Sequence, residues 1–473
     1  MELPVYHYEG NIVVGQDREY IQDYLDFPFE IPVGMGALRL RLRYSPLKVG
    51  DISNLITLGV YDPHGFRGFV SPNPPGREVV LSAGMATVGC IPGAILAGKW
   101  LAQLAIHCVV ADTKPCTYSL DIELMLETDT DIPVHHPMHS RQKQVAPGKA
   151  GWLRGELHSH TVHSDGVLTV NELIAQAHTN QLDFLAITDH NTVSALQDVE
   201  NIALDGLLII PGIEVTTFHG HALALGVERW VEWRTGYHGW TIEDSARLAR
   251  EMGGLFIVAH PNSVGSPICT GCQWEYADFD LDLADAIEVW NSQWDDIYDT
   301  NPKSLNLWHS LQQGKRRMPV TCGSDFHEMS HWGAGVPFTY IYASHRSTAD
   351  VLEGIRNGRM IISSGPWLSM QISTGEGNKT AGIGDTLSTK AGRVFLTTGW
   401  EKAPQGAQLI VRNKQDVILS EHAAGTGSVQ RWLDTQPDDR LWIELYAANG
   451  AMLAMTNPIY IKGLESADQE SLA

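Results

Sequence analysis

Alternating apolar and polar positions dominate the first part of the chain. Leu38, Leu40 and Leu42 alternate with arginines, and residues 118–124 repeat the same two-residue period. Because successive side chains of a strand point to opposite faces, each run predicts a strand with one buried face. Turn sequences rich in Pro, Gly, Asp and Asn separate the runs, and no helical period of useful length appears. We therefore predict a β-sandwich domain over residues 1–132.

The pattern changes in the middle of the chain. Residues 133–150 are polar and contain proline, which predicts a linker. After Trp152, short apolar runs alternate with amphipathic helical stripes, one of which follows the capping box Thr169-x-x-Glu172. Strands that alternate with helices are typical of βαβ units. We therefore predict an α/β domain with parallel strands over residues 151–366.

The last part of the chain returns to a strand pattern. Residues 394–397, 409–411 and 441–446 are apolar runs separated by Gly, Asn and Asp. Such short runs between turn residues predict strands. We expect a C-terminal β-sandwich domain over residues 367–473.

Side chains that can bind metal recur where the apolar runs of the middle domain end. His158 and His160, two residues apart, fall on one side of a strand, and Asp165 follows in a Ser-Asp-Gly turn. In parallel barrels the C-terminal ends of the strands form one face, so these side chains should converge. Singly, each is more often a satisfied histidine or a capping acid, but together they predict a metal centre. The nine candidates are His158, His160, Asp165, His190, Glu214, His221, His260, Asp325 and His327.

Composition and charge restrict the partners. The 473 residues are 43% hydrophobic and 19% charged, as in an ordinary globular protein, and the net charge is -22. Affinity for nucleic acids comes from Lys and Arg that neutralise phosphates, so a nucleic-acid partner is not expected. Without a signal-peptide pattern or a membrane-length apolar run, we expect a cytoplasmic protein that binds a small molecule and no membrane. The sequence specifies no oligomeric state.

The six cysteines show no disulfide-scaffold spacing, and we expect reduced thiols. Cys269 and Cys272 form a Cys-x-x-Cys pair with no second pair at zinc-ribbon distance. A staple of the loop, or no role, is therefore favoured over a structural zinc.

The motifs, in chain order, resemble those of the polymerase-and-histidinol-phosphatase (PHP) family. They are His-x-His with Ser-Asp-Gly, then Thr-Asp-His, Gly-x-Glu, His-Pro and Ser-Asp-x-His, and they cover about residues 150–365. The segments ending in Trp274, Asn291 and His327, beside flanking β domains, are most similar to the carbaryl-hydrolase-type branch. The resemblance implies a distorted (β/α)7 barrel in the α/β domain.

The resemblance also implies two or three divalent metal ions. It distributes the ligands as His158, His160, Glu214 and Asp325 on one ion, Glu214, His221 and His260 on a second, and Asp165, His190 and His327 on a third. Glu214 would bridge two of them. Mixed histidine and carboxylate ligands suit zinc, manganese or iron.

Several side chains near the candidate ligands are expected to contact the substrate or to orient a ligand. His219 lies two residues before His221, so either could point inward, and we prefer His221 because it starts an apolar run. His163 and His219 are candidates for a general acid near the leaving group. Asp189 is expected to orient a ligand. Arg154 and Asn291 are the expected substrate contacts.

Two cations can lower the pKa of a bridging water and supply hydroxide, so the leading prediction is a metal-dependent hydrolase. The family favours phosphoesters, and the branch includes a carbamate hydrolase. Residues 155–228 contain no Lys or Arg, whereas a phosphomonoester usually has a cationic clamp. Eight tryptophans between Trp230 and Trp332 could line an apolar pocket or fill the core. We therefore predict small phosphodiesters as substrates, with carbamate or carboxyl esters as the alternative.

The sequence also bears on two other classes of function. In a metal-stabilised binding scaffold the β domains would do the binding, but such a scaffold has no reason to keep all nine candidate ligands, and none is lost. A polymerase-associated proofreading role would need a basic track for nucleic acid, which the acidic chain lacks.

Overall fold

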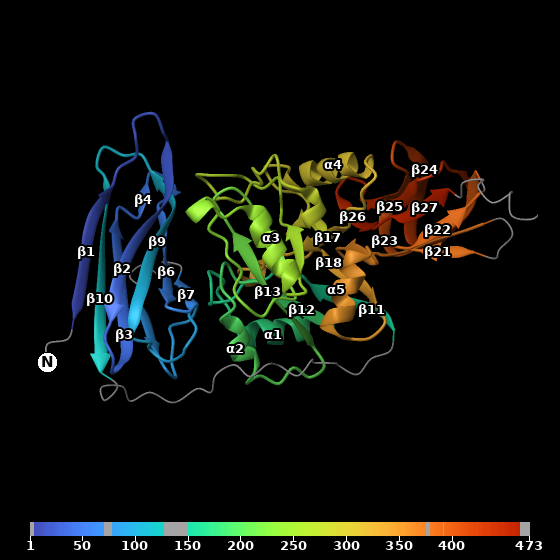
Figure 1. Ribbon diagram of the computed structural model, residues 1–473. Coiled ribbons are helices and arrows are strands. Elements are labelled where there is room, and N and C mark those ends of the chain that lie inside the picture. The colour runs from blue at the N-terminus through green and yellow to red at the C-terminus, as the bar shows by residue number, and fades with distance from the viewer. Residues whose placement is uncertain (1–3, 71–77, 127–149, 375–378, 391, 464–473) are drawn as a thin grey trace, which may run out of the picture.

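The computed structural model describes residues 4–70, 78–126, 150–374, 379–390 and 392–463 (Figure 1). The predicted linker, residues 133–150, lies outside the described residues except for Ala150. The chain is an α/β protein with one large mixed sheet and several antiparallel sheets. Among the described residues, no helix is both long enough and apolar enough to cross a membrane.

Two four-stranded antiparallel sheets form the N-terminal part, as the alternating pattern predicts. The first has the order β1 (Val5–Ile12), β10 (Cys116–Leu126), β3 (Met35–Ser45) and β8 (Glu78–Ser82). The second has the order β2 (Tyr20–Ile31), β9 (Gly98–Val110), β6 (Leu55–Asp62) and β7 (Gly65–Val70), and β4 (Lys48–Val49) pairs with β5 (Ile52–Ser53). Leu38 and Leu40 are buried in a core shared by both sheets, whereas Arg41 on the other face of β3 bonds Glu78 and Glu123.

Seven strands of the mixed sheet form its central part, and all of them except β16 carry candidate ligands within the strand or in the segment that follows it. They are β11 (Gly151–Glu156), β12 (Phe184–Ile187), β13 (Leu208–Thr216), β14 (His221–Leu225), β15 (Leu255–Val258), β16 (Ala286–Asn291) and β17 (Val320–Gly323). β11, β12 and β13 are parallel, β14 is antiparallel to β13 and β15, and β15, β16 and β17 are again parallel. A parallel bridge between Ser159 and Phe326 joins the segment after β11 to the segment after β17. The sheet therefore curls until its first and last strand ends meet.

Helices connect these strands and carry the caps that the sequence encodes. They are α1 (Val170–Thr179), α2 (Ala195–Val199), α3 (Ile242–Glu251), α4 (Thr300–Gln312) and α5 (Thr348–Arg356), with short 3-10 turns η2 (Tyr237–Gly239), η3 (Leu281–Leu283) and η4 (Met329–Trp332). Thr169 and Glu172 form the predicted capping box of α1. Val170, Leu173, Ile174 and Ala177 give α1 one buried face.

The C-terminal strands continue the same hydrogen-bonded sheet. They are β18 (Phe338–Ala343), β19 (Met360–Ser363), β20 (Trp367–Ser373), β21 (Thr380–Gly382), β22 (Thr386–Thr389), β23 (Arg393–Arg412), β24 (Val417–Asp434), β25 (Arg440–Tyr446), β26 (Met452–Thr456) and β27 (Ile459–Gly463). β18 pairs with β11, β19 with β18, and β26 with β19. Backbone hydrogen bonds thus connect the C-terminal strands to the ligand-bearing strands.

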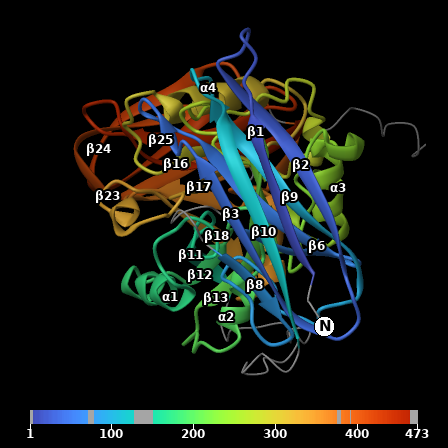
Figure 2. The same ribbon diagram turned by 90° about the vertical axis from the view of Figure 1, so that its left-hand side faces the viewer.

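The N-terminal sheets cover one end of the curled sheet. Figure 1 shows them beside the central strands, and Figure 2 looks onto them with the remaining strands behind. Tyr24 stacks on Phe218 with ring centroids 4.8 Å apart, and His107 stacks on Trp233 at 5.7 Å. Burial lowers the pKa of His107 to about 3, so its ring is neutral at pH 7. An aromatic contact layer therefore fixes the N-terminal sheets over the central strands.

A buried carboxylate ties the C-terminal strands to α4. Glu444 is fully buried and accepts hydrogen bonds from Trp442 and Tyr446 at 2.8 Å, while His309 of α4 and Arg412 lie 2.5 and 2.7 Å away. Burial alone would raise the pKa of Glu444, but His309 and Arg412 lower it to about 2. The folded protein therefore holds Glu444 as an anion.

Glu444→Gln is expected to lower the free energy of unfolding by about 1.5–3 kcal/mol at pH 7, because it weakens charge-assisted hydrogen bonds. Since the pKa falls from 4.5 to about 2 on folding, the contribution is complete above pH 4.5 and is lost as the pH drops toward 2. Denaturant unfolding at a series of pH values measures it. Glu421→Gln, at an exposed pair with Arg431, should cost at most about 1 kcal/mol. Equal losses in the two variants would contradict the assignment.

Candidate metal centre

The first group of candidate ligands comes from three places: the segment after β11, the segment after β17, and strand β13 itself. The Nε2 atoms of His158 and His160 each lie 3.3 Å from Oε2 of Glu214, and 3.3 and 3.1 Å from Oδ1 of Asp325. Two ligands about 2.0–2.1 Å from one ion at a tetrahedral angle are separated by about 3.3 Å. The four atoms are therefore spaced as ligands of one cation.

These four atoms are also buried and make no hydrogen bond within the part of the chain that the structure describes. His158 Nε2, His160 Nε2, Glu214 Oε2 and Asp325 Oδ1 have no hydrogen-bond partner among the described residues. Leaving buried polar atoms unpaired costs free energy, and four of them converging on one point is unfavourable unless a cation is bound there. The residues present thus fit a divalent metal ion.

A second group shares Glu214. Its other carboxylate oxygen, Oε1, lies 3.0 Å from Nδ1 of His221 and 3.2 Å from Nε2 of His260. His221 begins β14 and His260 follows β15, where its φ of 25° lies in the left-handed region. Glu214 therefore presents one oxygen to each group.

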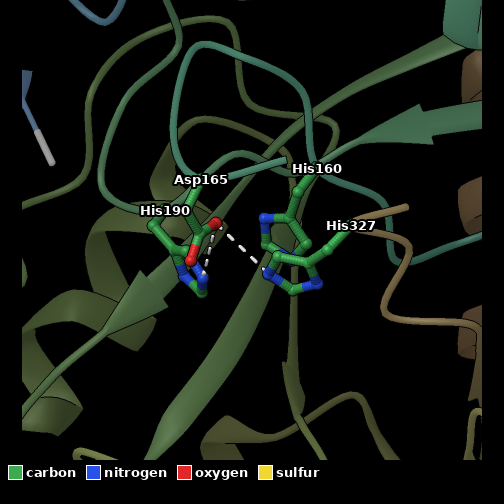
Figure 3. A group of neighbouring side chains, drawn as sticks. All are labelled: His160, Asp165, His190 and His327. Carbon is green, nitrogen blue, oxygen red and sulfur yellow. Dashed lines mark ion pairs between the residues drawn. The ribbon is translucent and has the colours of Figure 1, made fainter. Parts of the chain in front are cut away.

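A third group lies beside the first. Oδ1 of Asp165 is 3.4 Å from Nε2 of His190 and 3.2 Å from Nε2 of His327, and His160 completes the cluster (Figure 3). His190 also links to Glu214, with its Nδ1 2.8 Å from Oε2. All nine candidate ligands thus meet in one connected cluster of histidines and carboxylates.

The cluster keeps its carboxylates ionised. Burial would raise the pKa of Glu214, but His190, His158 and His221 lower it well below its usual value. Asp325 likewise has a pKa lowered well below normal, because His158, His160 and His327 outweigh its burial. Against burial, Asp165 and Glu214 raise the pKa of His190 to about 9. Anionic carboxylates are the form that binds cations, and bound metal would displace the histidine protons.

Asp189 bonds the loop between His160 and Asp165. The Asp189 carboxylate accepts hydrogen bonds from the Thr161 backbone and hydroxyl, both at 2.8 Å, and from Ser164 at 2.7 Å. These contacts fix the loop that carries His160 and Asp165. The orienting role of Asp189 stays a prediction, and these are the contacts through which it would act.

Glu288 and Glu156 are two buried acids whose roles the sequence analysis missed. Oε1 of Glu288 lies 3.2 Å from Nδ1 of His158, and Oε2 accepts from the backbone of His260 at 3.1 Å. Glu156 accepts from the backbone of His158 and of Ser324, and burial raises the pKa of its carboxyl to about 7. Glu288 stands inside the apolar run 286–290, and an acid in such a run was the signal that could have revealed it.

Four predicted residues lie away from the nine ligands. His163 is buried between Ser194 and Asp198 and lines a neighbouring cavity. His219 is half-exposed and pairs with Glu275 at 3.0 Å. The Arg154 guanidinium bonds the Asn180 carbonyl and lies over Phe338, while Asn291 donates to Glu288 at 3.1 Å. Among the described residues, the structure shows no contact that supports the predicted general-acid or substrate-binding roles of these four residues.

A cavity of about 450 Å³ opens onto the metal centre. The N-terminal sheets contribute Leu55, Thr57, Phe69 and His107 to its wall, and the loop after β15 contributes Ile268. Carboxylates and histidines of the three groups form its floor, and no Lys or Arg is among its described lining residues. Binding space at the centre is therefore enclosed jointly by the N-terminal sheets and the central strands.

The cysteines correct one expectation. Cys269 and Cys272 form a disulfide, so the prediction of reduced thiols is wrong for this pair. Cys90, Cys108, Cys116 and Cys322 are free and buried. Sequence separation alone could not reveal that the loop brings the two sulfur atoms together.

Comparison with known families bears out the family-level resemblance. Residues 156–258 match the family model of the PHP domain. This segment contains six of the nine candidate ligands: His158, His160, Asp165, His190, Glu214 and His221. The carbaryl-hydrolase-type branch remains a prediction.

Two curated relatives match a short part of the chain. The 5′-3′ exoribonuclease Rnm of Salmonella typhimurium is 45% identical over 65 residues, which are 13% of this chain and 22% of that protein. A 5′-3′ exoribonuclease of Haemophilus influenzae is 36% identical over 63 residues, 13% of this chain and 23% of that protein. The chain thus spans less than a quarter of the length of either relative.

Two solved structures are distantly similar. A two-domain protein from Bacteroides vulgatus, containing a predicted PHP-like metal-dependent phosphoesterase, is 16% identical, with 68% of this chain and all of that chain covered and a TM-score of 0.39. A putative metal-dependent phosphoesterase from Bifidobacterium adolescentis is 18% identical, with 37% and 87% covered and a TM-score of 0.27.

Proposed function

We propose that this protein is a metal-dependent hydrolase that cleaves small phosphodiesters. The observation that carries the proposal is the position of Glu214 at the floor of a cavity. One of its carboxylate oxygens faces the first group of ligands, and the other faces the second group. A carboxylate shared by two cations is typical of hydrolytic two-metal sites. A binding scaffold has no need of this arrangement beside an open cavity.

Different residues of the chain would bind the metal ions and position the ligands. His158, His160, Glu214 and Asp325 would hold one ion, Glu214, His221 and His260 a second, and Asp165, His190 and His327 a third. When bound, two or three zinc, manganese or iron ions would activate water and offset the negative charge that develops on the attacked centre. Asp189 and Glu288 fix the backbone and the imidazoles, and the N-terminal wall of the cavity limits the entry of water.

The cavity supports an ester with little negative charge. Lys and Arg are absent from its described lining, while Leu55, Phe69 and Ile268 offer apolar contacts to an organic group. A phosphomonoester dianion would need cationic side chains that this wall lacks. Carbamate or carboxyl esters, which the resemblance to the carbaryl-hydrolase-type branch suggests, remain the second candidate, because they carry no charge at the reacting group, whereas a phosphodiester carries one negative charge there.

The arrangement of the sheets supports the domain boundaries that the sequence predicts. We assign the curled strands of residues 151–366 to a distorted (β/α)7 barrel, flanked by β-sandwich domains over residues 1–132 and 367–473. The proposed place of action is the cytoplasm, on a small-molecule substrate, with neither nucleic acid nor membrane as partner.

The test compares kcat/KM for three 4-nitrophenyl substrates on one metal-loaded preparation. Bis(4-nitrophenyl) phosphate should be cleaved at least about tenfold faster than 4-nitrophenyl phosphate, since one lost ion pair is worth about 1.4 kcal/mol or more. Preference for the monoester would contradict the charge argument. Exclusive cleavage of 4-nitrophenyl N-methylcarbamate would select the second candidate, and cleavage of a 5′-phosphorylated oligoribonucleotide alone would move the substrate to the class named for the relatives.

A matched pair of variants tests the cavity wall directly. Leu55→Lys places a cation in the wall and should shift the preference toward the monoester. Leu47→Lys adds the same charge at an exposed position outside the lining and should leave the ratio unchanged. Equal diester-to-monoester ratios of kcat/KM in both variants would show that this wall does not select the substrate.

A further inference from the structure

The loop after β15 contacts the second group of ligands through its backbone. Nε2 of His221 lies 3.2 Å from the carbonyl oxygen of Thr270, and Nδ1 of His260 lies 3.3 Å from the carbonyl oxygen of Cys272. The opposite nitrogens of the two rings face Oε1 of Glu214. Each imidazole is thus held between a loop carbonyl and the bridging carboxylate.

These contacts choose the histidine tautomers. A backbone carbonyl can only accept a hydrogen bond, and so can the ionised carboxylate of Glu214, so both nitrogens of each ring face acceptors. Once a cation takes the nitrogen that faces Glu214, the remaining proton of His221 is on Nε2 and that of His260 on Nδ1, where the carbonyls accept it. The nitrogens that face Glu214 then carry a lone pair in the neutral rings. A lone pair is what a cation needs, so the two carbonyls prepare His221 and His260 as ligands.

Two features hold the carbonyls in place. Gly271, between Thr270 and Cys272, has a φ of 71°, and an added Cβ would lie 2.0 Å from the Thr217 carbonyl oxygen, so only glycine fits there. The Cys269–Cys272 disulfide closes the same turn from the other side. Cys272 is buried and Cys269 is exposed, so the bond can be reached by a thiol from solvent.

We propose that the Cys269–Cys272 disulfide is a positioning cross-link for the Glu214–His221–His260 group, and that its reduction weakens cation binding at this group alone. The cysteines act through the carbonyls of Thr270 and Cys272 and bind no metal themselves. The His158–His160 group has no contact with this loop among the described hydrogen bonds, so its affinity does not depend on the bond. The redox state of the loop thereby sets how many cations the centre holds.

The reducing agent in this scheme is a dithiol. Its thiolate attacks Sγ of Cys269, the S–S bond breaks, and Cys272 leaves as a thiolate that takes a proton from water. The second thiol of the reductant then resolves the mixed disulfide, which leaves two cysteine thiols and one oxidised dithiol. Two electrons pass from the reductant to the protein, and no other reactant is required.

The first measurement is metal binding to the full chain without substrate. In wild-type protein, zinc titrated against a competing chelator should fill the first and second groups. In C269S/C272S, which removes the cross-link without any reductant, one equivalent should bind with unchanged affinity and a second at least about tenfold more weakly. Gln273→Ala, a change at an exposed position of the same loop that keeps the disulfide, should retain both affinities.

The second measurement reads the histidine tautomers in protein that holds two equivalents of zinc. Nitrogen-15 NMR of wild-type protein should show His221 protonated at Nε2 and His260 at Nδ1, and the double variant should show a mixture for both rings. Wild-type protein reduced by a dithiol, then freed of it, should behave as the variant does and recover on reoxidation. This arm keeps the test valid if the variant fails to fold.

Unchanged second-site affinity and unchanged tautomers in reduced wild-type protein would overturn the proposal. Loss of both equivalents together would also overturn it, since the effect is assigned to one group. None of these measurements involves an ester, so the proposal stands or falls separately from the phosphodiesterase assignment.

Discussion

Glu214→Gln should remove at least one bound metal equivalent and lower kcat/KM for the best ester substrate by at least about 100-fold. The reason is geometric as well as electrostatic. Each carboxylate oxygen of Glu214 faces a different group of histidine nitrogens, whereas glutamine has one oxygen, and its NH2 has no lone pair for a cation. One of the two groups therefore loses its shared ligand whichever way the amide turns.

Metal analysis of the purified variant, together with kinetics at saturating metal, measures both effects. Glu275→Gln is the matched control, because Glu275 is exposed and pairs with His219 near the same loop. It should keep full metal content and full activity. If Glu214→Gln retained both as well, Glu214 would be merely a buried acid at a strand end.

His158→Ala should also remove a metal equivalent and at least about 100-fold of the activity, while the β strands of both ends of the chain stay folded. His158 supplies Nε2 to the first group, and its Nδ1 lies beside the fully buried Glu288. The variant therefore loses a ligand and leaves a buried carboxylate without its imidazole partner. Some loss of stability of the central strands is expected from that second effect.

The matched control is His178→Ala, which removes an exposed imidazole in the last turn of α1. Metal content, activity and circular dichroism should match the wild-type protein. Full metal content and full rate in His158→Ala would refute the assignment of the first group. A fall in the circular dichroism signal of the whole chain would contradict the claim that the damage is local.

Local patterns predicted most of the elements correctly because they depend on local physics. Capping boxes at Thr169 and Thr241 place the starts of α1 and α3 where the sequence indicates, since the side chain and the backbone N–H it bonds are three residues apart. The apolar runs 394–397 and 409–411 are strands, but they belong to one strand, β23, that is interrupted by irregular pairing near Ala403. A sequence pattern does not show whether an interruption is a turn or a bulge.

The sequence by itself determined which residues could bind metal and that they follow strand ends, because residue type and two-residue periodicity are local properties. Only the tertiary structure decided what lies around them. It placed Glu288 behind His158, a disulfide loop behind His221 and His260, and the N-terminal wall above the cavity, while it held His163 and His219 outside. These contacts join residues far apart in the chain, and their geometry depends on how strands curl and pack rather than on any spacing along the sequence.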